Sequence, residues 1–231
     1  MFGFNQHKQE LIKKGFSITN TIFSDGEIEN LKKLIGSSKD TYAIRQLFVK
    51  NPEIMEIVLS NDKFKRLISE VCEDDYFITK AIYFNKPAKS NWFVSYHQDI
   101  SISVENKIEA ESYTNWTNKN GQLGVIPPLE ILENTVTFRI HLDDTDETNG
   151  ALKVIPNSHS KGFIRVDENF KISEHGEEKL CKVRKGEVML MKPLLLHASQ
   201  KSISSTDRSV IHVELCNKNI PMGWLEKKEI V

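Results

Sequence analysis

The sequence has few cysteines, no long apolar run and almost no net charge, and each of these excludes a class of protein. Its three cysteines, Cys72, Cys181 and Cys216, lie far apart without a CxxC pair, so neither a disulfide framework nor a thiolate zinc site is expected. No window approaches the roughly 18 apolar residues that a membrane span needs. The polar N-terminus lacks the apolar run of a signal peptide. A net charge of −1 argues against a nucleic-acid partner, since such proteins usually carry a basic excess.

The composition is that of a folded protein. Of its 231 residues, 39% are hydrophobic and 27% are charged, a balance that allows a core and does not fit a disordered chain. This length is within the range of one large domain. We therefore expect a single domain over residues 1–231, located in the cytoplasm.

The first third of the chain, residues 1–75, has the pattern of helices. Ser24 and Glu27 form the S-x-x-E pattern of a capping box. Apolar residues follow this box at helical spacing: Ile28, Leu31, Leu34 and Ile35. A second helix follows the capping candidates Asn61 and Asp62, and its apolar residues are Phe64, Leu67, Ile68 and Val71. Nothing reactive lies on these faces, so we expect both helices to pack against a sheet.

From residue 76 to 216, short runs of β-branched and aromatic residues alternate with turn residues, which is typical of strands. We expect strands near 77–85, 94–102, 134–142, 151–155, 180–184, 187–192, 194–200 and 207–216. No strand–helix alternation and no Gly-rich phosphate loop occurs in this region. The pattern predicts a mostly β fold, a sandwich or a jelly-roll barrel, behind N-terminal helices. The polar segment 103–130 is long for a connection, and we expect it to be a lid or substrate loop.

A histidine followed two residues later by an aspartate occurs twice, at His97-x-Asp99 and His141-x-Asp143. Residues i and i+2 of a strand lie on one face, roughly 6–7 Å apart, so both side chains can reach one metal ion. With a distant histidine, such a pair forms the two-His-one-carboxylate triad of non-haem iron sites. The second pair runs into an acidic turn, which favours a solvated strand end. The first pair lies in an apolar and aromatic run, which favours a metal pocket, although a hydrogen-bonded core histidine is the alternative.

His197, at the end of an apolar run, is the candidate third ligand, and a core histidine is again the alternative. Eleven residues further on, Arg208 opens a strand and shares a face with Val210 and His212. A buried arginine requires an acidic partner or the carboxylate of a ligand. Spacing alone favours a surface arginine at a strand start.

The order of these motifs resembles that of the phytanoyl-CoA dioxygenase family, which are Fe(II)- and 2-oxoglutarate-dependent oxygenases. The resemblance covers roughly residues 75–216. Its elements are His97-x-Asp99, the run from Asn149-Gly150-Ala151-Leu152 through Ser158-His159, Gly186-Glu187-Val188, His197 and Arg208. Asn157 departs from the family, which usually has glycine there. The resemblance implies a double-stranded β-helix, which is a cupin-like jelly roll.

The resemblance also implies a catalytic iron centre of His97, Asp99 and His197. Arg208 would bind the distal carboxylate of 2-oxoglutarate with Ser199 as a helper, and the 149–159 stretch would be structural. The implied reaction hydroxylates a C–H bond of a small molecule with O2 and releases succinate and CO2. Because halogenating relatives lack the carboxylate that Asp99 supplies, hydroxylation is expected.

Four aromatic or cationic residues and one threonine are further site candidates. In the strand at 134–142, Thr137 and Arg139 look away from the apolar face, so both would face a barrel lumen. Thr137 is a candidate for the co-substrate and Arg139 for co-substrate or substrate, an exposed cation being the alternative for Arg139. Trp92, Tyr96 and Trp116 are candidates for the substrate pocket. Two other functions stay open: a cupin-like metal-binding barrel without redox chemistry, as an isomerase or sensor, and a catalytically degenerate binding protein.

Overall fold

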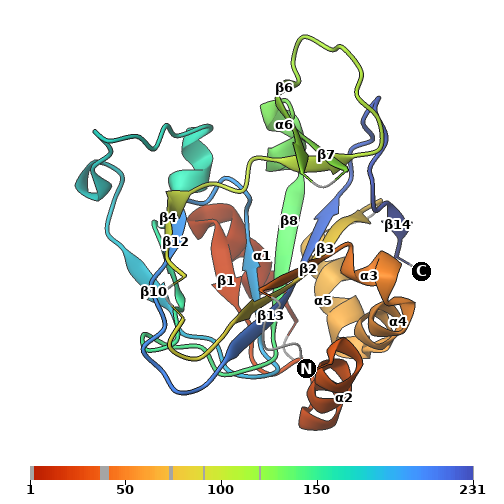
Figure 1. Cartoon of the computed structure of the whole chain (residues 1–231), viewed down its shortest axis with the longest axis vertical. Coiled ribbons are helices and arrows are strands. Elements are labelled where there is room, and N and C mark those ends of the chain that lie inside the picture. The colour runs from red at the N-terminus through yellow and green to blue at the C-terminus, as the bar shows by residue number, and fades with distance from the viewer. Residues whose placement is uncertain (1–2, 37–41, 73–74, 91, 120, 231) are drawn as a thin grey trace.

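The computed structural model describes residues 3–36, 42–72, 75–90, 92–119 and 121–230, and two antiparallel sheets form its centre (Figure 1). In this part of the chain the larger sheet has seven strands, in the order β1 (Phe16–Ile18), β11 (Val188–Met191), β8 (Thr135–His141), β13 (Arg208–Cys216), β3 (Phe77–Lys86) and β14 (Lys228–Glu229), with β2 (Ala43–Arg45) also on β3. The smaller sheet has the order β10 (Lys179–Cys181), β9 (Leu152–Val154), β12 (His197–Ser199) and β4 (Val94–His97).

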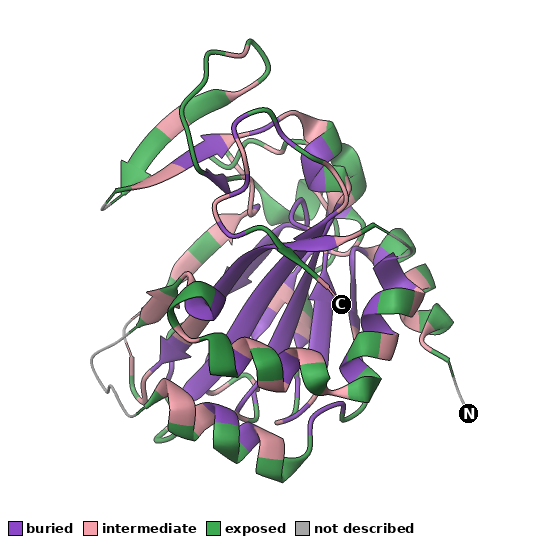
Figure 2. Ribbon diagram, turned by 90° about the vertical axis from the view of Figure 1, so that its right-hand side faces the viewer, coloured by how far each residue is buried: buried purple, intermediate pink, exposed green. Residues whose placement is uncertain are grey.

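Helices cover one face of the larger sheet, as Figure 2 shows. They are α1 (Asn5–Lys14), α2 (Asp25–Ile35), α3 (Leu47–Lys50), α4 (Pro52–Ser60) and α5 (Asp62–Cys72). The predicted capping box starts α2, and the Asn61 side chain accepts a hydrogen bond from the Phe64 backbone N–H at 2.8 Å to start α5. Phe64 then packs edge-on against Phe138 of β8, with ring centroids 5.7 Å apart. Both helices therefore pack against a sheet, as the sequence predicts.

The alternation of β8 separates two chemically different faces of the larger sheet. Phe138 and Ile140 join the apolar core beneath the helices. Arg139 lies between them in sequence and lines a cavity on the opposite face, where the smaller sheet lies. Polar side chains are therefore buried between the two sheets beside a small apolar cluster that includes Met189 and Leu152, and the larger apolar core lies beneath the helices.

The segment 103–130, expected as a loop, contains regular structure. Strands β5 (Ile102–Val104), β6 (Thr114–Lys119) and β7 (Gln122–Ile126) form a third sheet in the order β5-β7-β6, and α6 (Leu129–Glu133) follows. This sheet projects from one end of the larger sheet (Figure 1). Nearly every residue of β6 is exposed, so its polar composition hid the strand. The expectation of a loop was therefore wrong for 114–119 and 122–126.

The remaining segments are short. Several expected strands are shorter in the structure: 94–97 where 94–102 was expected, 179–181 where 180–184 was expected, and 197–199 where 194–200 was expected. Asp99 therefore lies beyond the end of β4 and not within a strand. Two single-turn 3-10 helices lie at Ser158–Lys161 and Ile172–Glu174. Within the described ranges, no helix combines the length and the apolar character needed to cross a membrane.

Candidate metal centre and its cavity

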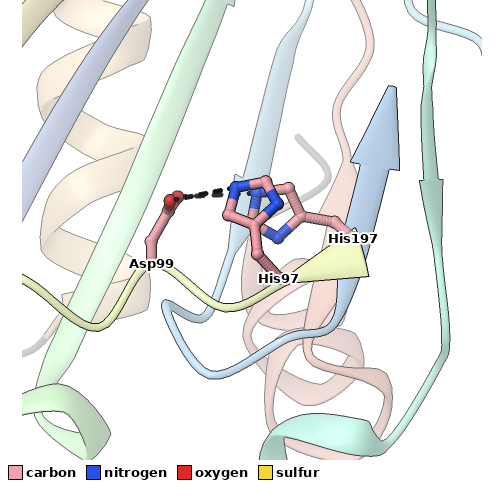
Figure 3. Close-up of side chains that lie close together, drawn as sticks. All are labelled: His97, Asp99 and His197. Atoms are coloured by element: carbon pink, nitrogen blue, oxygen red, sulfur yellow. Dashed lines mark ion pairs between the residues drawn. The ribbon is translucent and has the colours of Figure 1, made fainter. Parts of the chain in front are cut away.

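The three predicted ligands come together in the structure (Figure 3), and all three line the cavity between the sheets. His97 ends β4, His197 begins β12, and the two residues lie opposite each other in the antiparallel register. Asp99 Oδ1 lies 3.6 Å from His97 Nε2, and its Oδ2 lies 3.7 Å from His197 Nε2. Strand pairing thus brings together ligands that are a hundred residues apart in sequence.

Backbone carbonyls fix both imidazole rings. His97 Nδ1 lies 2.9 Å from the Ser95 carbonyl oxygen, and His197 Nδ1 lies 2.8 Å from that of Leu195. A carbonyl only accepts, so each Nδ1 carries the proton and each Nε2 has a free lone pair. Such second contacts set the tautomer and orientation of metal-binding histidines. The core-histidine alternative does not explain why both lone pairs meet at one carboxylate.

The charge states suit a divalent cation. Burial lowers the pKa of His197 to about 4, so this ring is neutral at ordinary pH. Burial opposes ionisation of Asp99, but the nearby histidines outweigh it and hold the carboxyl pKa well below its usual value. At His97, burial favours the neutral ring, yet the Asp99 carboxylate, which can accept from Nε2 of the protonated ring, outweighs burial and raises the pKa. Two imidazoles and a carboxylate are a donor set that Fe(II) accepts.

Arg208 is buried in the same cavity, which has a volume of about 640 Å³. The residue is only 5% exposed, so the surface position favoured by spacing alone was wrong. Its Nε and Nη1 atoms have no hydrogen-bond partner within the described residues. Burial and the charge of Arg139 lower its pKa. Buried guanidinium groups normally have acceptors, so the residues present fit a carboxylate ligand such as that of 2-oxoglutarate.

Lys86 is a second buried cation, which the sequence analysis missed. It lies opposite Arg208 in the β13–β3 register, is 1% exposed and lines the cavity. Its Nζ donates to Ser199 Oγ at 2.7 Å and to the Gln200 carbonyl at 2.5 Å. Burial, followed by the charge of Arg208, lowers its pKa to about 8. The available signal was strand alternation, because Lys80, Ile82, Phe84 and Lys86 share one face of β3.

The predicted Asn149-Gly150 turn makes room for this cation. Gly150 has φ +83°, and a Cβ there would lie 2.7 Å from Lys86 Nζ and 2.8 Å from the Gln200 carbonyl oxygen. The turn therefore needs glycine for both its conformation and the space. Ser199 Oγ also donates to the Gly150 carbonyl at 3.0 Å, so Ser199 connects the turn with the lysine.

The other candidates divide into two groups. Arg139 and Trp92 line the cavity, whereas Thr137, Tyr96 and Trp116 are not among the described residues that line it. The Tyr96 hydroxyl donates to Glu178, and the Trp116 ring lies 5.8 Å from Lys107 Nζ. Thr137 is buried, and its hydroxyl has no partner in the described structure. It lies two residues before Arg139 in β8.

The second His-x-Asp pair is not a solvated strand end, because His141 is buried. Its Nδ1 lies 2.8 Å from Thr145 Oγ1, and Asp143 pairs with Lys32 and accepts from Ser209. The acidic turn that follows suggested exposure, but the strand continues into the core up to His141.

The 149–159 stretch contacts the N-terminal region. His159 Nε2 donates to the Ile12 carbonyl at 3.0 Å, which ties the stretch to α1. Asn157 has φ +66°, a left-handed conformation that asparagine tolerates better than most residues. The departure from glycine at this position is therefore accommodated.

Comparisons with known proteins agree with this geometry. The phytanoyl-CoA dioxygenase family model matches residues 13–210. Among solved structures, EctD from S. alaskensis with 2-oxoglutarate and 5-hydroxyectoine is 16% identical, with a TM-score of 0.71 over 97% of this chain and 83% of that one. HygX from Streptomyces hygroscopicus with iron bound is also 16% identical, with a TM-score of 0.67 over 94% and 88% of the two chains.

The non-heme alpha-ketoglutarate-dependent carbocyclase SnoK from nogalamycin biosynthesis is 14% identical, with a TM-score of 0.65 over 92% and 83%. A search of curated proteins finds no match. The structural similarities confirm the jelly-roll fold predicted from the sequence. With the family match over most of its length, the chain belongs to the phytanoyl-CoA dioxygenase family of non-haem iron oxygenases that use 2-oxoglutarate.

Proposed function

We propose that the protein hydroxylates a C–H bond of a small molecule, with 2-oxoglutarate and O2 as co-substrates and succinate and CO2 as products. The observation that carries this proposal is the buried, unpartnered guanidinium of Arg208 in the same cavity as the His97, Asp99 and His197 cluster. A metal triad alone fits many reactions. A triad together with a buried arginine that lacks hydrogen-bond acceptors fits a keto acid, which can chelate the metal and also present a second carboxylate to the arginine.

The three ligands would hold Fe(II) from one side, and the iron with 2-oxoglutarate would supply the activation of O2. Arg208 binds the distal carboxylate in a charge-assisted pair. Lys86 adds a second positive charge beside Arg208. Its hydrogen bond to Ser199, which in turn donates to the Gly150 carbonyl, holds the lysine in place. Asp99 would supply the carboxylate ligand that halogenating relatives lack, which supports hydroxylation over halogenation.

The wall around the centre limits water. Ile82, Phe84 and Leu152 line the cavity between the sheets, and exclusion of water protects reactive oxygen chemistry. Thr117, Lys119 and other residues of the small third sheet also line the cavity, and Thr117 and Lys119 are exposed. This supports a role for the 103–130 segment as a substrate lid. A cytoplasmic location stays a prediction from composition.

The test is anaerobic titration of the Fe(II)-loaded protein with 2-oxoglutarate, followed by the visible absorption band that the keto acid gives on chelating Fe(II). Succinate release on admitting O2 is the second readout. We expect Asp99→Ala to lose iron, since one of three ligands is removed. We expect Arg208→Gln to retain iron and to weaken 2-oxoglutarate binding about 10- to 100-fold, the effect of losing a hydrogen-bonded charge pair.

Arg165→Gln is the matched control, because the Arg165 side chain is 87% exposed and pairs only with Asp167 among the described residues. Metal binding without any 2-oxoglutarate band would refute the proposal and favour a cupin-like metal barrel. A band without succinate release from any substrate pool would favour a degenerate binding protein.

A further inference from the structure

Arg139 is a buried cation that no residue in the described part of the chain neutralises through an ion pair. It lines the cavity from β8 and is 6% exposed. Its Nη1 lies 3.1 Å from His212 Nδ1, and its Nε is buried without a partner. An uncompensated buried guanidinium is costly unless a ligand supplies the missing acceptor.

The contact with His212 orients Arg139 without neutralising it. A guanidinium only donates, so His212 Nδ1 accepts and the ring proton is on Nε2. That Nε2 donates to Glu214 Oε1 at 2.9 Å. Glu214 in turn pairs with Lys80 Nζ at 2.9 Å. The charge of the Glu214 carboxylate is therefore already balanced by Lys80, and the His212 ring between Glu214 and Arg139 is neutral. The positive charge of Arg139 remains available to a ligand.

Arg139 is close to the metal ligands. Asp99 and Arg139 interact electrostatically, and the charge of Arg139 acts on His97 and His197 as well. Arg139 pairs with His212 in the β13–β8 register, and Arg208 pairs with Lys86 in the β13–β3 register. His212 lies four residues further along β13 than Arg208. The two guanidinium groups are close enough for the charge of Arg139 to lower the pKa of Arg208, but they stand at different positions along β13. A group held by Arg139 would thus lie beside the metal centre, and Arg208 would still be available to 2-oxoglutarate.

The charges of the residues that line the cavity also favour an anionic ligand. Two carboxylates line it, Asp99 and Glu214, against six cationic side chains: Arg45, Lys80, Lys86, Lys119, Arg139 and Arg208. Binding divalent iron and dianionic 2-oxoglutarate adds no net charge, so the positive excess persists in the loaded protein. Such a cavity favours an anionic substrate.

We propose that the substrate is a small polar carboxylic acid and that the guanidinium of Arg139 binds its carboxylate. This inference rests on the proposed function and specifies the substrate class for the same site. The planar fork of arginine matches a carboxylate with two parallel hydrogen bonds. Ser101, Ser103 and Gln122 also line the cavity and offer hydrogen bonds to hydroxyl or amino groups of the same molecule.

The experiment uses the Fe(II)- and 2-oxoglutarate-loaded protein under anaerobic conditions. A panel of small 2-amino and 2-hydroxy acids is titrated beside the matching carboxamides, and binding is followed by the change in the visible absorption band. We expect acids to perturb the band and carboxamides to leave it unchanged. Arg139→Gln should weaken the binding of the acids about 10- to 100-fold while 2-oxoglutarate affinity stays at the wild-type level.

Two further variants keep the test decisive. Arg139→Lys retains the charge and loses the fork, so it should bind the acids with intermediate affinity. Arg165→Gln, which removes an exposed arginine, should match the wild type. Thermal unfolding and iron content of each variant establish that it is folded and loaded. If Arg139→Gln does not fold, the wild type and Arg139→Lys decide the question.

Acids that perturb the band no more than their carboxamides overturn the proposal. A loss of 2-oxoglutarate affinity in Arg139→Gln also overturns it, because Arg139 would then serve the co-substrate. Failure of the wild type to form the band at all is a different result, since it refutes the proposed function itself.

Discussion

Glu226 is a buried carboxyl group that we expect to destabilise the protein near neutral pH. The residue is 3% exposed and lies outside the residues that line the cavity. Its Oε2 accepts a hydrogen bond from the Ala81 backbone N–H at 3.0 Å, and its Oε1 has no partner in the described structure. Burial raises its pKa to about 7 and outweighs the opposing effects of Ala81 and Lys80.

The sign and size of the effect follow from the two pKa values. An ordinary glutamate has a pKa of 4.5, so between pH 4.5 and about 7 the folded state binds more protons at Glu226 than the unfolded state. The free energy of unfolding therefore falls as the pH rises through this window and is level above it. A difference of about 2.5 pH units at roughly 1.4 kcal/mol each gives a cost of about 3 kcal/mol above pH 7.

Glu226→Gln should remove this cost, since the amide keeps an acceptor for Ala81 and has no charge to bury. Urea unfolding of the two proteins should give similar free energies below pH 4.5 and a variant about 3 kcal/mol more stable above pH 7. Glu229→Gln, at a side chain that is 69% exposed, is the control and should follow the wild type. Parallel pH profiles for the wild type and Glu226→Gln would refute the reasoning.

Three further predictions concern the site and its support. The pKa of His97 is raised, so as the pH is lowered, protonation of His97 should begin to weaken metal binding while the pH is still above 6.5. Calorimetric titrations of the metal at a series of pH values measure this affinity, and a loss of affinity that begins only below pH 6.5 would contradict the prediction. Gly150→Ala should lower the free energy of unfolding by about 1–3 kcal/mol and weaken 2-oxoglutarate binding, because the new Cβ would lie 2.7 Å from Lys86 Nζ. An unchanged free energy of unfolding and an unchanged 2-oxoglutarate affinity would refute the close contact. Ser158→Ala should cost about 1–3 kcal/mol in urea unfolding, since Leu196 N–H donates to the buried Ser158 Oγ at 2.8 Å, and a neutral result would count against that hydrogen bond.

The sequence predicted those features that follow from local periodicity. Helical spacing and capping residues located α2 and α5, and strand alternation separated Phe138 from Arg139. The motif order identified the two histidines and the aspartate that meet in the structure. These predictions succeeded because each depends on chemistry within a few residues or on a recognisable order of motifs.

Other features depend on tertiary packing and could not be predicted in this way. Lys86 has the sequence context of a strand end, and only the approach of β12 and the Gly150 turn buries it. Strand β6 has polar residues on both faces, so no apolar alternation marks it. His141 looked exposed because of the acidic turn that follows, although the strand keeps it buried.

The two faces of the larger sheet have different energetic roles. On one face, helices bury a continuous apolar core that includes Phe138, Ile140 and Ile211, which is the main source of folding free energy. On the other face, the sheet buries Arg208, Lys86 and Arg139, and burial lowers the pKa of each. The burial of these three cations opposes folding in the ligand-free protein, and anions bound beside them should reduce that cost. Ligand binding of this kind stabilises the folded state in proportion to the logarithm of ligand concentration, so the cationic face is better explained by anion binding than by structural support.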